Sequence, residues 1–340
     1  FVRIPKYKYK LWNVDSPSKN AHEIDIIFDT KDTTDILGVS CKTPMTSGAS
    51  GNCKNGEYMT HPAFISMGVN GFWAGKFETG YKGATSTETA QVNSNDASKI
   101  IIKPNSYSWR NLTVMNMFTA TYNYKRAMNS HMMKNTEWGA IVYLSHSKFG
   151  IDRDINLNNN SSQKTGYSAL PSTNQQVFPG VYGDGSSYNK AYNTEVGYLA
   201  STTGNISGVY DISGGTHEYV ASYVNGYLGS SGFTTSTIAT YDSKYFDVYN
   251  ANSTISSYQY RILGDATGEV GTFRQYADND GSSRWHNSWY KDHSDFASSN
   301  YPWFARGGSY PYGALTSQFT FARNNGIALN DIGFRTALAP

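Results

Sequence analysis

The sequence predicts an α+β fold with short strands, two helices and long loops. Apolar and polar residues alternate at the two-residue period of a strand near both ends of the chain, and apolar residues recur at helical spacing in the middle. Charged residues make up only 16% of the 340 residues, whereas the chain holds 32 glycines and 27 tyrosines. Such a composition builds many turns and relies little on charge.

The first strand is predicted in residues 1–12, where aromatic residues alternate with lysines. We expect the lysines to form one solvated face of this strand; they are Lys6, Lys8 and Lys10. The segment 23–28 predicts a partner strand, because Ile24 and Ile26 alternate with acidic residues as on a half-buried strand. The alternation breaks at Ile27 and the residue after it, so we expect burial on both faces at this end.

A further strand is predicted in residues 71–78, and two helices follow it. The first helix is expected from residue 111 to about residue 129, where apolar residues recur roughly at helical spacing. The second is expected over 136–147, with Gly150 ending it. Methionines in the first helix are expected to be core residues.

Polar stretches dominate the second half of the chain. Residues 152–193 and 225–300 are rich in Asn, Ser, Gly and aromatic residues and predict long loops. Near the C-terminus, Phe319 and Phe321 alternate with polar residues and predict another short strand. Tyr, Ser, Gly and Asn are also the residues of adaptable binding loops, although tyrosines can equally pair across exposed strands.

Charge and hydropathy exclude some partners. The formal net charge of +2 gives no electrostatic reason to expect nucleic acid. No run approaches the ~18 apolar residues that a membrane helix needs, so we expect no membrane insertion. The cysteines, Cys41 and Cys53, are expected either to form a disulfide, which suits an oxidising compartment, or to remain free thiols.

Several segments, in this order along the chain, resemble the formylglycine-generating-enzyme (sulfatase-modifying factor) superfamily. They are 71–78 (GFWAGKFE), 137–140 (EWGA) with 143–145 (YLS), 208–220 (GVYDISGGTHEYV), 306–309 (RGGS) and 333–335 (GFR). The resemblance implies a C-type-lectin-like fold with small mixed sheets over residues 65–340. Residues 1–64 look like a β segment that precedes such domains in phage tail and bacterial surface proteins, and we expect this segment to pack on the main domain.

The resemblance implies two competing functions. One branch of the superfamily oxidises a substrate cysteine with copper held by thiolates, and soft thiolates do select Cu(I). Residues 54–340 contain no cysteine, so we expect no enzyme activity, no catalytic residue and no cofactor. The other branch uses the scaffold for binding and includes the variable proteins of diversity-generating retroelements.

Other chemical signals are weak. Asp278 and Asp280 resemble the opening of a calcium loop, but the distal glutamate of an EF-hand is missing, so an ordinary turn is preferred to a calcium site. His217 is expected to have a hydrogen-bonded structural role. Arg306 and Arg335 are expected to pair with internal carboxylates such as Glu218 or Glu78 rather than with an anionic ligand.

The resemblance places a ligand-binding surface between the RGGS-like and GFR-like segments and just before them. Carried over by position, the surface consists of Tyr301, Ala305, Tyr310, Tyr312, Leu315, Thr316, Ser317, Gln318, Thr320, Arg323, Asn324 and Asn325. An aromatic run upstream is expected either to form the wall of the same site, as a hot-spot anchor, or to cover the core; its members are Trp285, His286, Trp289 and Tyr290.

The sequence therefore predicts an extracellular recognition protein on a cell surface or virion, such as an adhesin or phage receptor-binding protein. Its expected partner is a host or cell-surface protein or a glycan. The alternative is a structural subunit of a filament, virion or tail, in which the partners are copies of the chain itself in a filament or trimer. A formylglycine-generating-type oxidase is a remote third hypothesis.

Overall fold

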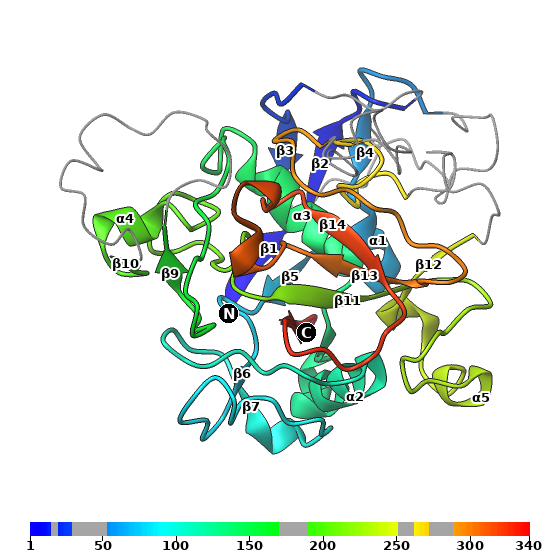
Figure 1. The fold of residues 1–340 in the computed structure, drawn as a ribbon. Coiled ribbons are helices and arrows are strands. Elements are labelled where there is room, and N and C mark those ends of the chain that lie inside the picture. The colour runs from blue at the N-terminus through cyan, green and yellow to red at the C-terminus, as the bar shows by residue number, and fades with distance from the viewer. Residues whose placement is uncertain (15–19, 29–52, 170–189, 251–261, 272–287) are drawn as a thin grey trace, which may run out of the picture.

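The computed structural model describes residues 1–14, 20–28, 53–169, 190–250, 262–271 and 288–340. These residues form a mixed α+β structure with small sheets and few helices, as the sequence predicts. Figure 1 shows the sheets and helices interleaved with long connections. The resemblance implies a C-type-lectin-like architecture, which is a more specific description than a mixed α+β structure.

The largest sheet is mixed and is built around strand β11 (His217–Val224). On one side, β11 pairs antiparallel with β13 (Trp303–Arg306), which in turn pairs antiparallel with β14 (Phe321–Asn324). Strand β11 also pairs in parallel with β15 (Ile332–Phe334) at its beginning and with β12 (Asp247–Tyr249) at its end. The sheet thus brings the C-terminal strands beside a strand from the middle of the chain.

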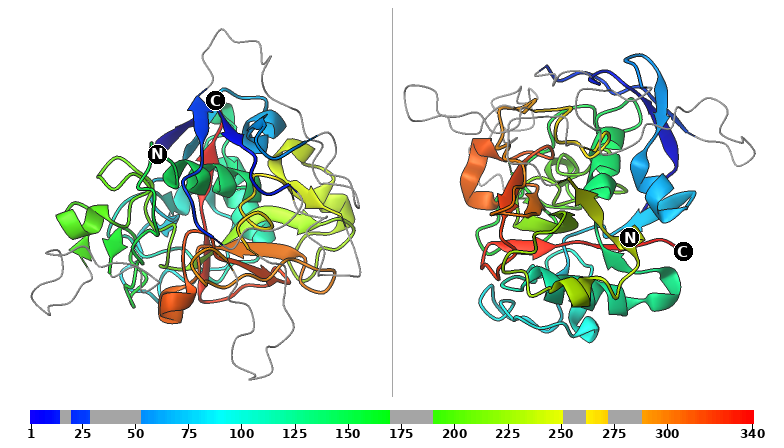
Figure 2. Two further views of the ribbon diagram at one scale, coloured as in Figure 1. Left: turned by 90° about the horizontal axis from the view of Figure 1, so that it is seen from above. Right: turned by 90° about the vertical axis from the view of Figure 1, so that its right-hand side faces the viewer.

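A second sheet joins the two ends of the chain. Its order is β1 (Val2–Pro5), β5 (Gly71–Ala74), β16 (Thr336–Leu338) and β8 (His131–Met132), with every pair antiparallel. Because the first and the last strand both border β5, the termini lie near each other (Figure 2).

The remaining strands form smaller units. A three-stranded antiparallel sheet has the order β3 (Ile26–Phe28), β2 (Tyr7–Lys10) and β4 (Tyr58–Thr60), so the predicted pairing of 1–12 with 23–28 is confirmed. Two further ladders join β6 (Gly80–Tyr81) to β7 (Ile100–Ile101) and β9 (Tyr167–Ser168) to β10 (Lys190–Ala191).

Two details of the three-stranded sheet of β3, β2 and β4 differ from the prediction. Lys8 is buried rather than solvated, because β2 is the central strand and has neighbours on both sides. Ile27 is 47% exposed rather than buried, because the alternation of side chains continues through β3 and turns it away from Ile26. Lys10 is exposed as predicted and forms an ion pair with Asp25 at 3.6 Å.

Both predicted helices are present, with shorter bounds. Helix α2 (Val114–Tyr124) begins after Thr113, whose side chain accepts a hydrogen bond from the Asn116 N–H, as an N-cap residue does. Helix α3 (Asn135–Ser145) is buried along nearly its whole length. Figures 1 and 2 show the two helices on opposite sides of β11, and both contact that strand.

Among the described residues, the other helical segments are short, and of these only Arg126–Met128 lies within a predicted helix, that of residues 111–129. They are α1 (Pro62–Met67), α4 (Glu195–Tyr198), α5 (Thr235–Ile238) and the 3-10 turns Ala97–Lys99, Arg126–Met128, Ser243–Tyr245 and Tyr310–Leu315. Helices this short show too little periodicity to be distinguished from turns in a sequence.

The core is continuous across the N-terminal segment and the rest of the chain. Tyr7 and Phe64 lie in the same buried cluster as Trp138 of α3, and the Tyr7 hydroxyl donates a hydrogen bond to the Ala140 carbonyl at 2.7 Å. Gly139 allows α3 to approach the segment 262–271, since a Cβ there would lie 1.9 Å from a backbone oxygen of that segment. The described residues of the segment 1–64 therefore pack on the main body by side-chain contacts as well as through β1.

Candidate functional site

The first two residues of β11, His217 and Glu218, have side chains in two different environments. Successive side chains of a strand point to opposite faces of a sheet. Glu218 lies in a buried charged cluster and accepts a hydrogen bond from Arg335 Nε at 3.0 Å. His217 instead lines a hollow at the surface. The two environments are described in turn.

The guanidinium of Arg335 is fully engaged inside the molecule. It forms a two-point contact with the Glu218 carboxylate and donates to the backbone oxygens of Gly75 and Asp211 at 2.9 and 3.0 Å. The predicted internal pairing of Arg335 with Glu218 is therefore confirmed. Such a bidentate pair fixes β15 and the following residues against β11.

The prediction that Arg306 pairs with an internal carboxylate such as Glu218 or Glu78 is wrong. Its guanidinium donates to the side-chain oxygen of Asn135 at 3.3 Å and to the backbone oxygens of Asp265 and Ala266 at 3.4 and 3.1 Å. No ion pair of Arg306 occurs within the described ranges, because Glu218 is already occupied by Arg335. Burial lowers the pKa of Arg306 to about 10, a value that still leaves the group charged at neutral pH.

Further carboxylates complete the charged cluster. Glu78 accepts hydrogen bonds from the Ser108 hydroxyl and from the Thr216 N–H, the latter at 2.8 Å. Asp211 accepts from the Gly166 N–H at 2.8 Å and from a side-chain amide. Burial raises the pKa of Glu78 well above its usual value, and the negative charges of Asp211 and Glu218 raise it further. The cluster is thus closed by internal partners and is structural.

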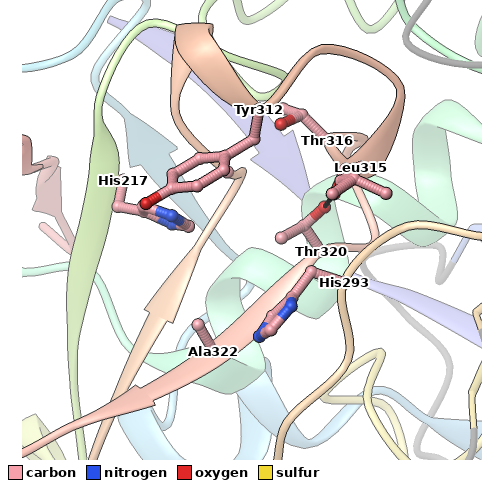
Figure 3. A pocket seen from close by; sticks show the side chains of 8 residues that line it. His217, His293, Tyr312, Leu315, Thr316, Thr320 and Ala322 are labelled. Atoms are coloured by element: carbon pink, nitrogen blue, oxygen red, sulfur yellow. Dashed lines mark hydrogen bonds between the residues drawn. The ribbon is translucent and has the colours of Figure 1, made fainter. Parts of the chain in front are cut away.

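The hollow beside His217 is the candidate functional site, and we call it the Tyr312 pocket. It has a volume of about 200 Å³ and is lined by His217, His293, Gly308, Tyr312, Leu315, Thr316, Thr320 and Ala322. Figure 3 shows the rings of His217 and Tyr312 on one side and that of His293 near Ala322 on the other. The lining comes from the start of β11, the connection between β13 and β14, the strand β14 and the loop before β13.

The rim of the pocket is aromatic. Tyr312 is 50% exposed, and its ring centroid lies 5.6 Å from that of His217 at an interplanar angle of 55°. It occupies the turn Tyr310–Leu315, which contains Gly313 at a φ of 50°, a left-handed conformation that favours glycine. The turn therefore presents a large ring to solvent at the mouth of the hollow.

His217 provides a neutral imidazole. Burial lowers its pKa to about 4, so the ring is uncharged at neutral pH. Its Nδ1 atom is covered and has no hydrogen-bond partner in the part of the chain that the structure describes.

The floor of the pocket is mainly apolar. The Thr320 hydroxyl is bound to Asp292 Oδ2 at 3.2 Å and accepts from the Ser317 N–H at 2.9 Å. The Thr316 hydroxyl donates to the Ser309 carbonyl at 3.3 Å. Because these hydroxyls are engaged by the protein and both threonines are fully buried, the apolar surface left for a ligand is that of Leu315 and Ala322.

Among the described residues, no Lys, Arg, Asp or Glu lines the pocket. A buried carboxylate, that of Asp292, is held behind the floor by the hydroxyls of Ser317 and Thr320. Burial raises its pKa to about 6. Arg323, a predicted ligand residue, is held by Asp295 at 2.9 Å, so its charge is already paired.

The structure brings part of the predicted surface together. Tyr312, Leu315, Thr316 and Thr320 line the pocket. The other predicted residues that remain at least partly exposed surround it or continue along β14; they are Tyr301, Tyr310, Arg323, Asn324 and Asn325. Arg323 also lies over the Tyr301 ring, 5.1 Å from its centroid, so these two side chains pack against each other.

Seven predicted ligand residues are buried. Thr316 and Thr320 are among them although they border the pocket, and for the other five the structure corrects the prediction: Trp289, Tyr290, Ala305, Ser317 and Gln318. The aromatic run was expected either to form the wall of the site or to cover the core. Trp289 covers the core, because its ring packs 5.0 Å from that of Phe319. Gln318 is held by the Ile155 N–H and the Arg153 carbonyl, both at 2.9 Å. These side chains have internal partners and no path to a ligand. Trp285 and His286 lie outside the described residues.

Sequence analysis missed His217, His293, Gly308 and Ala322 as site residues. His217 was expected to have a hydrogen-bonded structural role; a backbone hydrogen bond with Arg306 fits that role, while Nδ1 has no partner among the described residues. His293 lies in the polar segment 225–300, which was expected to be a long loop. No local pattern marks Gly308 or Ala322, because they line the pocket only through the pairing of β13 with β14.

The remaining predicted features are metal, disulfide and membrane sites. The calcium candidates Asp278 and Asp280 lie outside the described residues, and no group of three metal-binding side chains occurs within the described ones. Cys53 forms a disulfide, and its predicted partner, Cys41, lies outside the described residues. Among the helices that the structure describes, none is long and apolar enough to cross a membrane.

Comparison with known proteins gives no assignment: no family model matches the chain, and no curated protein matches it.

Proposed function

We propose that this chain is an extracellular recognition protein that binds a protein or glycan ligand through the Tyr312 pocket and the C-terminal surface around it. The observation that carries the proposal is the pocket itself: a hollow of about 200 Å³ with a half-exposed tyrosine at its mouth. Concave, mostly apolar sites with a few polar groups are the usual form of ligand sites.

The location of the pocket supports the same function. It lies within the segment that the resemblance to formylglycine-generating-enzyme-type proteins designates as the binding surface, between the sequences RGGS and GFR. The finer fold assignment, a C-type-lectin-like domain of the non-enzymatic branch, is part of this proposal. It is supported by the two long helices at the expected places and by the small mixed sheets.

Affinity rather than turnover is the proposed output. The pocket lining offers imidazole, phenol and aliphatic groups but no thiol, and thiolates are what the oxidase branch requires. The disulfide at Cys53 supports the proposed extracellular location, since disulfides persist in oxidising compartments.

The test is a binding screen with matched tyrosine variants. The full chain is applied to an array of glycans and to immobilised host-cell surface proteins, beside Tyr312→Ala and Tyr227→Ala. Tyr227 is similarly exposed, at 42%, but follows the far end of β11. The proposal expects a ligand whose binding falls at least about tenfold in Tyr312→Ala and is unchanged in Tyr227→Ala. Binding that both variants retain would place the ligand site elsewhere.

A further inference from the structure

The size of the Tyr312 pocket limits its occupant to a single small group. Its volume of about 200 Å³ is below the roughly 300–1,000 Å³ of sites that hold a complete drug-sized ligand. The pocket therefore accommodates one ring with a short substituent, while the remainder of a larger ligand stays on the surrounding surface.

The charges around the pocket disfavour an ionic occupant. Among the described residues, no Lys, Arg, Asp or Glu lines it, and Arg323 is paired with Asp295. Asp292 lies behind Thr320, so an anion would lie near a carboxylate and would find no lysine or arginine partner among these residues. Desolvating a charge without a partner is strongly unfavourable, which leaves uncharged groups.

The two sides of the pocket have different chemistry. On one side, Tyr312 offers a half-exposed ring beside the imidazole of His217. On the other, Leu315 and Ala322 form an apolar floor. A plain sugar ring would satisfy the first side but would bury hydroxyls against the second without partners. An aliphatic side chain would satisfy only the floor.

We propose that the Tyr312 pocket binds a single uncharged N-acetylated hexosamine ring at the end of a glycan, an inference that rests on the proposed recognition function. The apolar face of the sugar packs on Tyr312, and the acetyl methyl group contacts Leu315 and Ala322. The acetamido group is polar and lies between these two sides, beside the imidazole of His217.

This assignment gives each lining group one role. Tyr312 supplies flat apolar contact area that loses little conformational freedom on binding. The floor discriminates an acetamido group from a hydroxyl. Gly308 leaves room for the Thr316 side chain; a Cβ there would lie within 2.9 Å of three Thr316 side-chain atoms, so a larger residue would displace that side chain.

The experiment measures the binding of methyl glycosides to the full chain by saturation-transfer NMR and calorimetry. The ligands are those of N-acetylglucosamine, N-acetylgalactosamine, glucose, galactose and N-acetylneuraminic acid. We expect at least one N-acetylhexosamine to bind about tenfold or more tightly than its parent hexose and than the acidic sugar. Tighter binding of the acidic sugar or of the parent hexose would overturn the inference.

Variants separate the roles of the lining residues. Tyr312→Ala is expected to weaken binding about tenfold or more, Tyr312→Phe to retain it, and Leu315→Ser to reduce the preference for the acetylated sugar over its parent hexose. Tyr227→Ala is the control, and unchanged thermal unfolding establishes that each variant is folded. If Leu315→Ser left the preference unchanged in a folded protein, the acetyl group would not lie on the floor.

The outcomes also separate this inference from the proposed function. A protein ligand that depends on Tyr312, together with no binding of any monosaccharide, overturns the sugar assignment and leaves the recognition function standing. Absence of any ligand in both the glycan and the protein screens, with a folded chain, overturns both.

Discussion

His217 and Glu218 are consecutive in the sequence, yet they belong to two regions of opposite character. Glu218 enters a closed cluster in which Arg335 has partners on all sides, whereas His217 borders a hollow and has an unpaired nitrogen. The comparison teaches that satisfied hydrogen bonds distinguish the charged cluster, which holds the fold, from the neutral pocket, which is available for binding. The following predictions test that difference.

The largest effect is expected from Arg335→Met. Removing one partner of a buried ion pair leaves Glu218 uncompensated and costs about 3–5 kcal/mol of unfolding free energy. Lys10→Met is the control, since the pair of Lys10 with Asp25 is about half exposed and is worth about 0–1 kcal/mol. Urea unfolding measures both. Similar losses in the two variants would show that the cluster is not essential to the fold.

Glu78→Gln is expected to stabilise the protein at alkaline pH. The folded pKa of Glu78 is raised by burial and by neighbouring carboxylates, so its stabilising contribution is complete below the unfolded pKa and is lost as the pH rises through the folded pKa. The glutamine oxygen can still accept from the Thr216 N–H, and its NH2 group can donate to the Ser108 oxygen, so both contacts can be made without the charge. We expect a gain of about 1–2 kcal/mol at pH 8.5 that vanishes near pH 4.5.

Glu195→Gln, at an exposed position in α4, provides the matched control and should show no comparable gain. If Glu78→Gln instead destabilised the protein at every pH, the carboxylate would be required in its ionised form, and the cluster would need another explanation.

The contribution of His217 to the stability of the protein is expected to have the opposite pH dependence to that of Glu78. The folded pKa of His217 is lowered to about 4 by burial, below the ~6.5 of an unfolded chain. Its stabilising contribution is therefore complete above about pH 6.5 and is lost as the pH falls toward 4. His217→Gln should remove this loss, which we place at about 1 kcal/mol because the ring is half-buried. Thermal unfolding of both proteins between pH 7 and 4 measures it, and parallel curves would contradict the prediction.

The smallest effect on stability is expected from Tyr312→Ala. The side chain is half exposed and contacts His217 by its ring alone, so we expect a change within about 0.5 kcal/mol. A melting-temperature measurement checks this beside the binding assay. A loss of several kcal/mol would mean that Tyr312 is a structural cover of the core, like Trp289, rather than a binding residue.

The difference between Tyr312 and Trp289 also shows how far the sequence predicts the site. Both are aromatic residues in polar, irregular segments, and both were placed at the binding surface. Trp289 is only 5% exposed and packs against Trp12 and Phe319, residues distant from it in the chain. A local sequence pattern contains no information on which distant residue will cover an aromatic ring.

The sequence by itself determined the α+β class, the positions of α2 and α3, the pairing of residues 1–12 with 23–28, and the internal role of Arg335. These follow from the periodicity of neighbouring residues, which is local, and from the high cost of leaving a charge buried without a partner. The family resemblance added the region that contains Tyr312. Only the tertiary structure decided the pocket, because His217, His293 and Ala322 meet through the pairing of β11 with β13 and of β13 with β14. That pairing joins segments far apart in the chain, and its register fixes which side chains face the hollow and which are buried.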